Sequence, residues 1–281
     1  MLRKTVRFMC VLLTTLSLGF ALTGAAADFD KALNAYEKGD YKTALEEWRI
    51  SANQGDASAQ YNLGLMYANG QGVSQDDTEA AQWFRRAAEQ DLVQAQYDLG
   101  LMYANGQGVS QDDTEAAQWF RRAAEQELVQ AQYNLGLMYA NGQGVSQDDT
   151  EAAQWFRRAA EQDLVQAQLN LSLMYMRGDG VPQDYTKASQ WVRRAAEQGD
   201  VKAQYNLSIM YYKGMGVTRN PVMAYVASNL AAAQGHQKAR KNQDIIAKTL
   251  SREQIDEGQR MTSEWQVGTP LPYFKDFKTW P

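Results

Sequence analysis

A repeat with a period of 36 residues constrains this chain of 281 residues more than any other feature. The second and third copies differ only at Asp91/Glu127 and at Asp98/Asn134. The five copies occupy residues 55–90, 91–126, 127–162, 163–198 and 199–234. Self-similarity at such a period is typical of architectures in which each unit covers its neighbour. We therefore expect a stack of similar units rather than a globule with one central core.

Two stretches of each copy place apolar residues at helical spacing. In the first copy these residues are Ala59, Leu63, Met66 and Tyr67, followed by Ala80, Trp83, Phe84, Ala87 and Ala88. Residues three or four positions apart share one face of a helix, so both stretches predict amphipathic helices. Gly70 can end the first helix in the left-handed conformation, and Asp76 with Glu79 predicts a capping box for the second. Each copy is therefore expected to be a helical hairpin.

The sizes of the apolar residues indicate how the hairpins pack. One hairpin cannot bury the rings of Trp83 and Phe84 alone, so each unit needs the next one to cover them. A small residue at one position of every first helix lets the second helix approach closely. These small residues are Gly64, Gly100, Gly136, Ser172 and Ser208. The pattern predicts a continuous helical stack.

The pattern A-x3-L-G-x2-Y-x2-G-x-G-V-x2-D-x3-A-x2-W-x3-A-A, which runs from Ala59 to Ala88, resembles the Sel1-like repeat, a longer relative of the tetratricopeptide repeat. The resemblance covers residues 55–234. It implies an all-α fold, an α/α right-handed superhelical solenoid of helical hairpins. Three acidic residues replace the glycine that usually closes a unit: Asp91, Glu127 and Asp163. Ala227 stands where the fifth copy should have tryptophan, so we expect looser packing there.

Segments on both sides of the repeats are predicted to cap the stack. Residues 28–54 are predicted to form a tighter, tetratricopeptide-like capping hairpin. Residues 235–265 are expected to form two C-terminal capping helices, the second opened by a capping box of Ser251 and Gln254. Residues 266–281 are rich in proline and aromatic residues, which predicts either a segment extended on the solenoid or a frayed tail.

Residues 1–27 have the features of a cleavable signal peptide. Three basic residues open this segment: Arg3, Lys4 and Arg7. The apolar stretch over residues 11–22 is shorter than a typical membrane span. Ala25 and Ala27 are the small residues that signal peptidase requires before a cut at Asp28. We expect secretion to the periplasm and no membrane span in the mature chain, and an uncleaved N-terminal anchor is the alternative.

The composition argues against a metal site of His and Cys, against nucleic-acid binding and against most kinds of catalysis. One cysteine and one histidine cannot furnish a closed His/Cys metal site, and a sequence pI of about 5.1 argues against a nucleic-acid partner. Asp76 and Asp77, with their copies, could form an acid/base pair or bind calcium, but their place at a helix start favours capping. His236 is expected to be an exposed residue that opens a capping helix. We expect no catalytic residue, no metal and no cofactor.

The resemblance to tetratricopeptide hairpins implies that certain first-helix positions face a concave groove. These partner-binding candidates, called the ladder below, are Tyr61, Leu65, Asn69, Tyr97, Leu101, Asn105, Tyr133, Leu137, Asn141, Tyr205 and Tyr212. Aromatic rings give contact area at low entropic cost, and asparagine can donate to and accept from a peptide backbone. We therefore predict a non-enzymatic scaffold that binds a protein or peptide partner along its concave face. The alternative is that the tyrosines only pack between units.

Cysteine-rich relatives in the family suggest a second hypothesis, a binder or weak hydrolase of β-lactams or peptidoglycan fragments. The mature chain would lack cysteine, because Cys10 lies in the signal segment. None of the motifs S-x-x-K, S-D-N and K-T-G occurs, so the serine machinery of the standard enzymes is absent. The scaffold hypothesis is therefore the favoured one.

Overall fold

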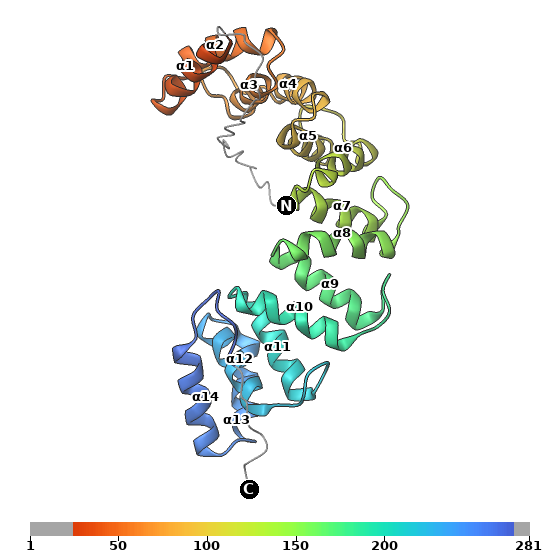
Figure 1. Ribbon diagram of the computed structural model, residues 1–281, viewed down its shortest axis with the longest axis vertical. Coiled ribbons are helices and arrows are strands. Elements are labelled where there is room, and N and C mark those ends of the chain that lie inside the picture. The colour runs from red at the N-terminus through yellow and green to blue at the C-terminus, as the bar shows by residue number, and fades with distance from the viewer. Residues whose placement is uncertain (1–24, 273–281) are drawn as a thin grey trace. The chain divides into compact units, whose positions relative to one another are not determined.

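The computed structural model describes residues 25–272, with side chains from residue 29 onward (Figure 1). Within that range all regular secondary structure is helical, which confirms the predicted all-α repeat class. Contacts divide the chain after Ser146 into two units, which are described separately. No helix of the described range is long and apolar enough to cross a membrane. The predicted signal segment as far as residue 24, and the tail from residue 273, lie outside that range.

The described part of unit one, from residue 25, contains seven helices, and each packs against the next. They are α1 (Ala25–Glu37), α2 (Tyr41–Asn53), α3 (Ala57–Asn69), α4 (Asp77–Glu89), α5 (Val93–Asn105), α6 (Asp113–Glu125) and α7 (Val129–Asn141). The hairpin of α1 and α2 joins the first repeat through a buried cluster around Trp48, which includes Leu63, Met66 and Trp83. This hairpin therefore covers the apolar surface that the first repeat presents.

As far as residue 272, unit two also contains seven helices. They are α8 (Asp149–Glu161), α9 (Val165–Arg177), α10 (Tyr185–Glu197), α11 (Val201–Lys213), α12 (Pro221–Ala233), α13 (Gln237–Ala247) and α14 (Arg252–Glu264). Both α13 and α14 pack on α12, ten of whose 13 residues are buried, including Ala227. The expectation of looser packing at Ala227 was wrong, because α12 is covered by two C-terminal helices instead of by another repeat.

The segment that follows α14 returns to the fourth repeat. Gly268 donates its backbone N–H to the carbonyl of Glu197 at 2.8 Å, and Leu271 donates to the Glu197 side chain at 2.9 Å. Leu271 is buried. The described part of this segment is therefore fixed at the C-terminal end of α10.

The ends of the repeat helices largely follow the predicted capping chemistry. Gly70 ends α3 with φ of 66°, the left-handed conformation that glycine adopts at little cost. The Asp76 carboxylate accepts two backbone N–H bonds at 3.0 Å at the start of α4. Only the half of the predicted capping box in which Asp76 accepts is formed. The other half, a bond from the Asp76 N–H to Glu79, is replaced because that N–H donates to the carbonyl of Tyr67 at 3.0 Å. The box is not needed where the loop itself satisfies that donor.

Caps at the C-terminal end confirm the sequence interpretation. Asn220 caps α12 ahead of Pro221, and Ser251 forms a complete capping box with Gln254 at the start of α14. His236 caps α13, because its Nδ1 accepts from the backbone N–H of Ala239 at 3.1 Å. The imidazole is half-buried and stacks on Tyr205, so the prediction of an exposed histidine was wrong, whereas its place at the start of a capping helix was correct.

The second glycine of each Gly-x-Gly loop lies against the preceding repeat. Gly108 has φ of 69°, and a side chain there would overlap with the carbonyl of Asp77 at the start of α4. The same arrangement recurs at Gly144 with Asp113, Gly180 with Asp149, and Gly216 with Tyr185. Each loop thus connects a repeat to the one before it through a backbone contact that only glycine permits.

The turns between repeats keep the left-handed conformation that the glycine of the family pattern would adopt, although the residues there are acidic. Asp91, Glu127 and Asp163 have φ of 62°, 65° and 63°. The Asp91 carboxylate accepts from Gln96 at 3.1 Å and pairs with Arg122 at 2.8 Å. These contacts offset part of the cost of a left-handed conformation for a residue with a side chain.

The large rings lie inside the hairpin stack, as predicted. Trp83, Trp119 and Trp155 keep at most 8% of their surface exposed, and Phe84 and Phe120 are buried. A Cβ at Gly100 would lie 2.8 Å from two ring carbons of Phe120, so the absence of a side chain lets α5 and α6 approach. Burial of these rings is the main apolar contribution to stability of each repeat.

Candidate functional site

The ladder residues of unit one lie on its first helices α3, α5 and α7. Tyr61 and Leu65 are buried, whereas the counterparts Tyr97, Leu101, Tyr133 and Leu137 are half-buried. The three asparagines are exposed: Asn69, Asn105 and Asn141. The second and third repeats therefore present partly accessible apolar side chains beside exposed amides, and the first repeat presents only its amide.

The tyrosines of the ladder also pack within the fold. The Tyr61 ring lies 5.5 Å from the ring of Phe84, and Tyr97 lies 5.7 Å from Phe120, in tilted arrangements. These contacts order the rings before any partner arrives, so packing and partner binding are compatible roles for one side chain.

One acidic residue stands among the ladder side chains of unit one. Asp98 accepts from the Tyr61 hydroxyl at 3.0 Å, and burial raises the pKa of Asp98 to about 7. Burial and the neighbouring Asp98 raise the pKa of the Tyr97 hydroxyl. Asn134 occupies the equivalent position of the third repeat. The two nearly identical repeats thus differ in one titratable group at this face, a carboxyl in the second repeat and an amide in the third.

The corresponding first helices of unit two carry different side chains. Leu169 and Met176 are half-buried, and Leu173 is 38% exposed. Tyr205 is half-buried and stacks on His236 with ring centroids 4.6 Å apart. Tyr212 is half-buried beneath the guanidinium of Arg219. This face is therefore apolar like that of unit one but without its regular asparagine series.

Two sets of side chains connect repeats in a way that the sequence interpretation missed. The first arginine of each Arg-Arg pair donates to a tyrosine hydroxyl of the next repeat, as Arg85 does to Tyr103 and Arg121 to Tyr139. The second arginine lies over the tryptophan of its own helix, as Arg86 does over Trp83 at 4.3 Å. The recurrence of Arg and Tyr 18 residues apart was the signal that could have revealed the first contact.

Buried glutamines form the second set. Gln96 donates to the carbonyl of Ala88 at 3.2 Å and accepts from Gln126 at 2.8 Å. The same pair of bonds recurs at Gln60, Gln168 and Gln204. An amide inside an apolar interface must be hydrogen-bonded, so these glutamines fix the register of successive repeats.

The first carboxylate of each Asp-Asp pair acts as a helix cap, and the second is the first residue of that helix. Asp112 and Asp148 accept backbone N–H bonds at the starts of α6 and α8, as Asp76 does at α4. Among the described residues no group of three or more His, Cys, Asp or Glu side chains is arranged to hold a metal ion. The helix dipole favours a carboxylate at these positions, which accounts for their recurrence.

Helical hairpins that recur every 36 residues, each with a Gly-x-Gly loop between its two helices and with buried rings at its contacts, define a helical-repeat protein of the solenoid class. The Sel1 repeat matches residues 57–92, 93–128, 129–164, 165–200 and 201–236. The chain belongs to the Sel1 repeat family, whose repeats generally mediate protein interactions.

Two solved structures are similar in fold and in sequence. A protective antigen of uropathogenic Escherichia coli strains that displays a Sel1-like repeat fold is 36% identical, with a TM-score of 0.75. The match covers 85% of this chain and 53% of the antigen. A Sel1 repeat protein from Oxalobacter formigenes is 31% identical with a TM-score of 0.72, over 85% of this chain and 100% of that protein.

A curated relative matches over a shorter region. An exopolysaccharide production negative regulator of Rhizobium leguminosarum bv. viciae is 40% identical over 52 residues. This region spans 18% of the present chain and 20% of the regulator, so the chain corresponds to a small part of that protein.

Proposed function

We propose that this chain is a secreted scaffold that binds an extended segment of a partner protein along the first helices of unit one. The observation that carries the proposal is the series of half-buried apolar residues and exposed asparagines on α5 and α7, repeated at 36-residue spacing. A regular series of this kind suits a backbone that passes successive repeats in one extended conformation. The family's general role in protein interactions supports the proposal.

The rings that would meet a partner are held in advance. Tyr97 is half-buried and its ring packs against Phe120, so little side-chain entropy is lost when a peptide binds. The amide of Asn105 donates to the carbonyl of Leu101 at 2.8 Å and keeps its oxygen available as an acceptor. Affinity is expected to come from the rings and specificity from the amides.

A selection with a random peptide library tests this proposal, followed by fluorescence anisotropy with the selected peptide. We expect the double variant Tyr97→Ala/Tyr133→Ala to weaken binding by about tenfold or more, the usual loss for aromatic anchors. The matched control is Gln82→Ala/Glu125→Ala, which alters exposed residues on second helices and should leave affinity unchanged. Equal affinity for both variants would assign the tyrosines to packing alone.

Export is a separate part of the proposal. The basic head, the apolar stretch and the small residues before Asp28 support cleavage and passage to the periplasm. Mass spectrometry of the protein recovered from the periplasmic fraction should find a chain that begins at Asp28. Recovery of the full chain from the cytoplasm alone would contradict export.

A further inference from the structure

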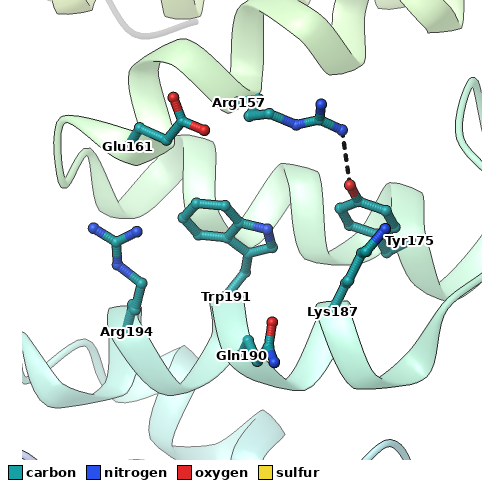
Figure 2. A pocket seen from close by; sticks show the side chains of 7 residues that line it. All are labelled: Arg157, Glu161, Tyr175, Lys187, Gln190, Trp191 and Arg194. Atoms are coloured by element: carbon teal, nitrogen blue, oxygen red, sulfur yellow. Dashed lines mark hydrogen bonds between the residues drawn. The ribbon is translucent and has the colours of Figure 1, made fainter.

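Unit two carries a surface hollow of about 380 Å³ that the ladder does not include (Figure 2). Its lining comes from α8, α9 and α10 and consists of Arg157, Glu161, Tyr175, Lys187, Gln190, Trp191 and Arg194. Figure 2 shows Arg157 and Glu161 on one side and Trp191 on the other, with Tyr175 and Lys187 at one end. Three cations and one carboxylate therefore surround an aromatic floor in a chain whose formal net charge is −5.

The donors of the hollow are only partly used within the fold. Arg194 pairs with Asp163 at 2.8 Å, whereas Arg157 donates to the neutral hydroxyl of Tyr175 at 2.8 Å. Lys187 has Asp184 on its own helix at 3.8 Å, and its side chain is 57% exposed. Arg157 forms no ion pair with any residue of the described range.

Unit one contains the same constellation with one difference. The seven equivalent residues, 72 positions earlier, are Arg85, Glu89, Tyr103, Glu115, Gln118, Trp119 and Arg122. Six of the seven are identical, and Glu115 stands where unit two has Lys187. In unit one the Glu115 carboxylate accepts the indole N–H of Trp119 at 3.2 Å. The fold thus contains its own example of a carboxylate bound against this set of side chains.

At position 187 a lysine stands where unit one has Glu115, so unit two has an ammonium donor in place of a carboxylate acceptor. Trp191 is half-buried, and its indole N–H donates no hydrogen bond to a residue of the described range. The buried N–H of Trp155 also has no partner there, although Glu151 stands four residues before it, so the bond of Glu115 to Trp119 is one of two arrangements of this pair. Figure 2 shows the indole nitrogen on the side of the ring that faces Tyr175 and Lys187. An indole N–H, an ammonium group and a guanidinium group therefore border a space that a carboxylate fills in unit one.

We propose that this hollow binds a carboxylate side chain from an acidic segment of a partner protein. The bound carboxylate would take the place relative to Trp191 that Glu115 holds relative to Trp119, and Lys187 and Arg157 would supply its counter-charges. Hydrogen bonds between charged partners are stronger than neutral ones, and the guanidinium geometry matches a carboxylate. The site is separate from the ladder, so either proposal can fail without the other.

A defined probe tests the assignment on the full chain. A labelled peptide of alternating glutamate and serine, and its glutamine counterpart, are titrated in fluorescence anisotropy at low salt. We expect the glutamate peptide to bind at least about tenfold more tightly, and Lys187→Glu to remove a similar factor. Trp191→Phe should weaken binding less, because it removes one donor and keeps the ring.

Two further variants separate this site from general charge attraction. Lys202→Glu makes the same charge change at an exposed position of α11 outside the hollow and should leave affinity within about twofold. Glu115→Lys makes the lining of unit one identical to that of unit two and should raise the number of bound peptides from one to two. Equal losses for Lys187→Glu and Lys202→Glu, or equal binding of the glutamine peptide, would overturn the proposal.

Discussion

At the scale of the residue, the contact between the two helices of a repeat depends on one small side chain facing one large ring. Gly64 and Gly100 lie against Phe84 and Phe120, with no room for a Cβ. The fourth repeat has Ser172 and Val192 at these positions, and the fifth has Ser208 and Ser228. The hydroxyls of both Ser172 and Ser208 are buried without a hydrogen-bond partner in the described range. Serine therefore occurs there because the opposite residue is smaller.

This compensation predicts a double-mutant cycle. Gly100→Ser should destabilise unit one by about 1–3 kcal/mol, since the new side chain overlaps with the Phe120 ring. Phe120→Val alone should also destabilise by leaving a cavity. The double variant copies the fourth repeat and should lose less than the sum of the single losses, by about 0.5–3 kcal/mol. Urea unfolding of all four proteins measures this coupling, and additive losses would contradict it.

The same scale shows which residues the sequence could predict. Burial of Trp119 followed from ring size and helical spacing, which are local properties of the chain. The contact of Arg85 with Tyr103 was not predicted, since an arginine on a helix that also carries glutamates resembles a solvated face. Only the placement of the next repeat brings an acceptor within reach of that guanidinium.

At the scale of the element, the helix ends were predictable and the loops were not. A cap depends on residues within four positions, so Gly70, Asp76 and Ser251 identified helix ends from sequence. The role of the second glycine in each loop depends on the backbone of the preceding repeat. No local rule supplies that neighbour, so the contact of the second glycine could not be predicted from the loop sequence.

The loop contact predicts unequal costs for two glycine substitutions. Gly55 and Gly108 both have positive φ, but a Cβ at Gly55 has no atom within 4 Å. Gly55→Ala should therefore cost only the left-handed strain of about 1–2 kcal/mol. Gly108→Ala should cost about 1–3 kcal/mol more, because it also overlaps with the Asp77 backbone. Chemical denaturation of both variants measures the difference, and equal losses would show that the loop yields without cost.

At the scale of the whole molecule, the period alone predicted the class of fold, since a repeated hairpin with an apolar surface must be covered by its neighbour. The identity of the binding residues is less accessible from sequence. Tyr61 and Tyr97 occupy equivalent positions, yet one is buried and the other is half-buried. The exposure of each tyrosine depends on the residues that surround its repeat, and the repeat pattern gives no information about them.

Deletion of residues 91–126 tests modularity of the molecule as a whole. The deletion joins Gln90 to Glu127, the same pair of residue types that meets at Gln126 and Glu127, so the junction keeps its native chemistry. Two of the fourteen described helices, α5 and α6, disappear, so the helical circular dichroism per molecule should fall by about one seventh. The denaturant m-value should fall as less surface is buried, while unfolding stays cooperative.

A deletion out of phase with the period provides the control. Removing residues 91–108 takes away α5 and its loop and leaves α6 without the first helix of its hairpin. The rings of Trp119 and Phe120 then lose their cover, and that variant should unfold at lower denaturant than the deletion of a whole repeat. If both deletions abolish cooperative unfolding, stability resides in the assembled molecule and not in contacts between neighbouring repeats. If only the deletion out of phase abolishes cooperative unfolding, the hairpin is the folding unit, and whole hairpins can be added to the stack or removed from it.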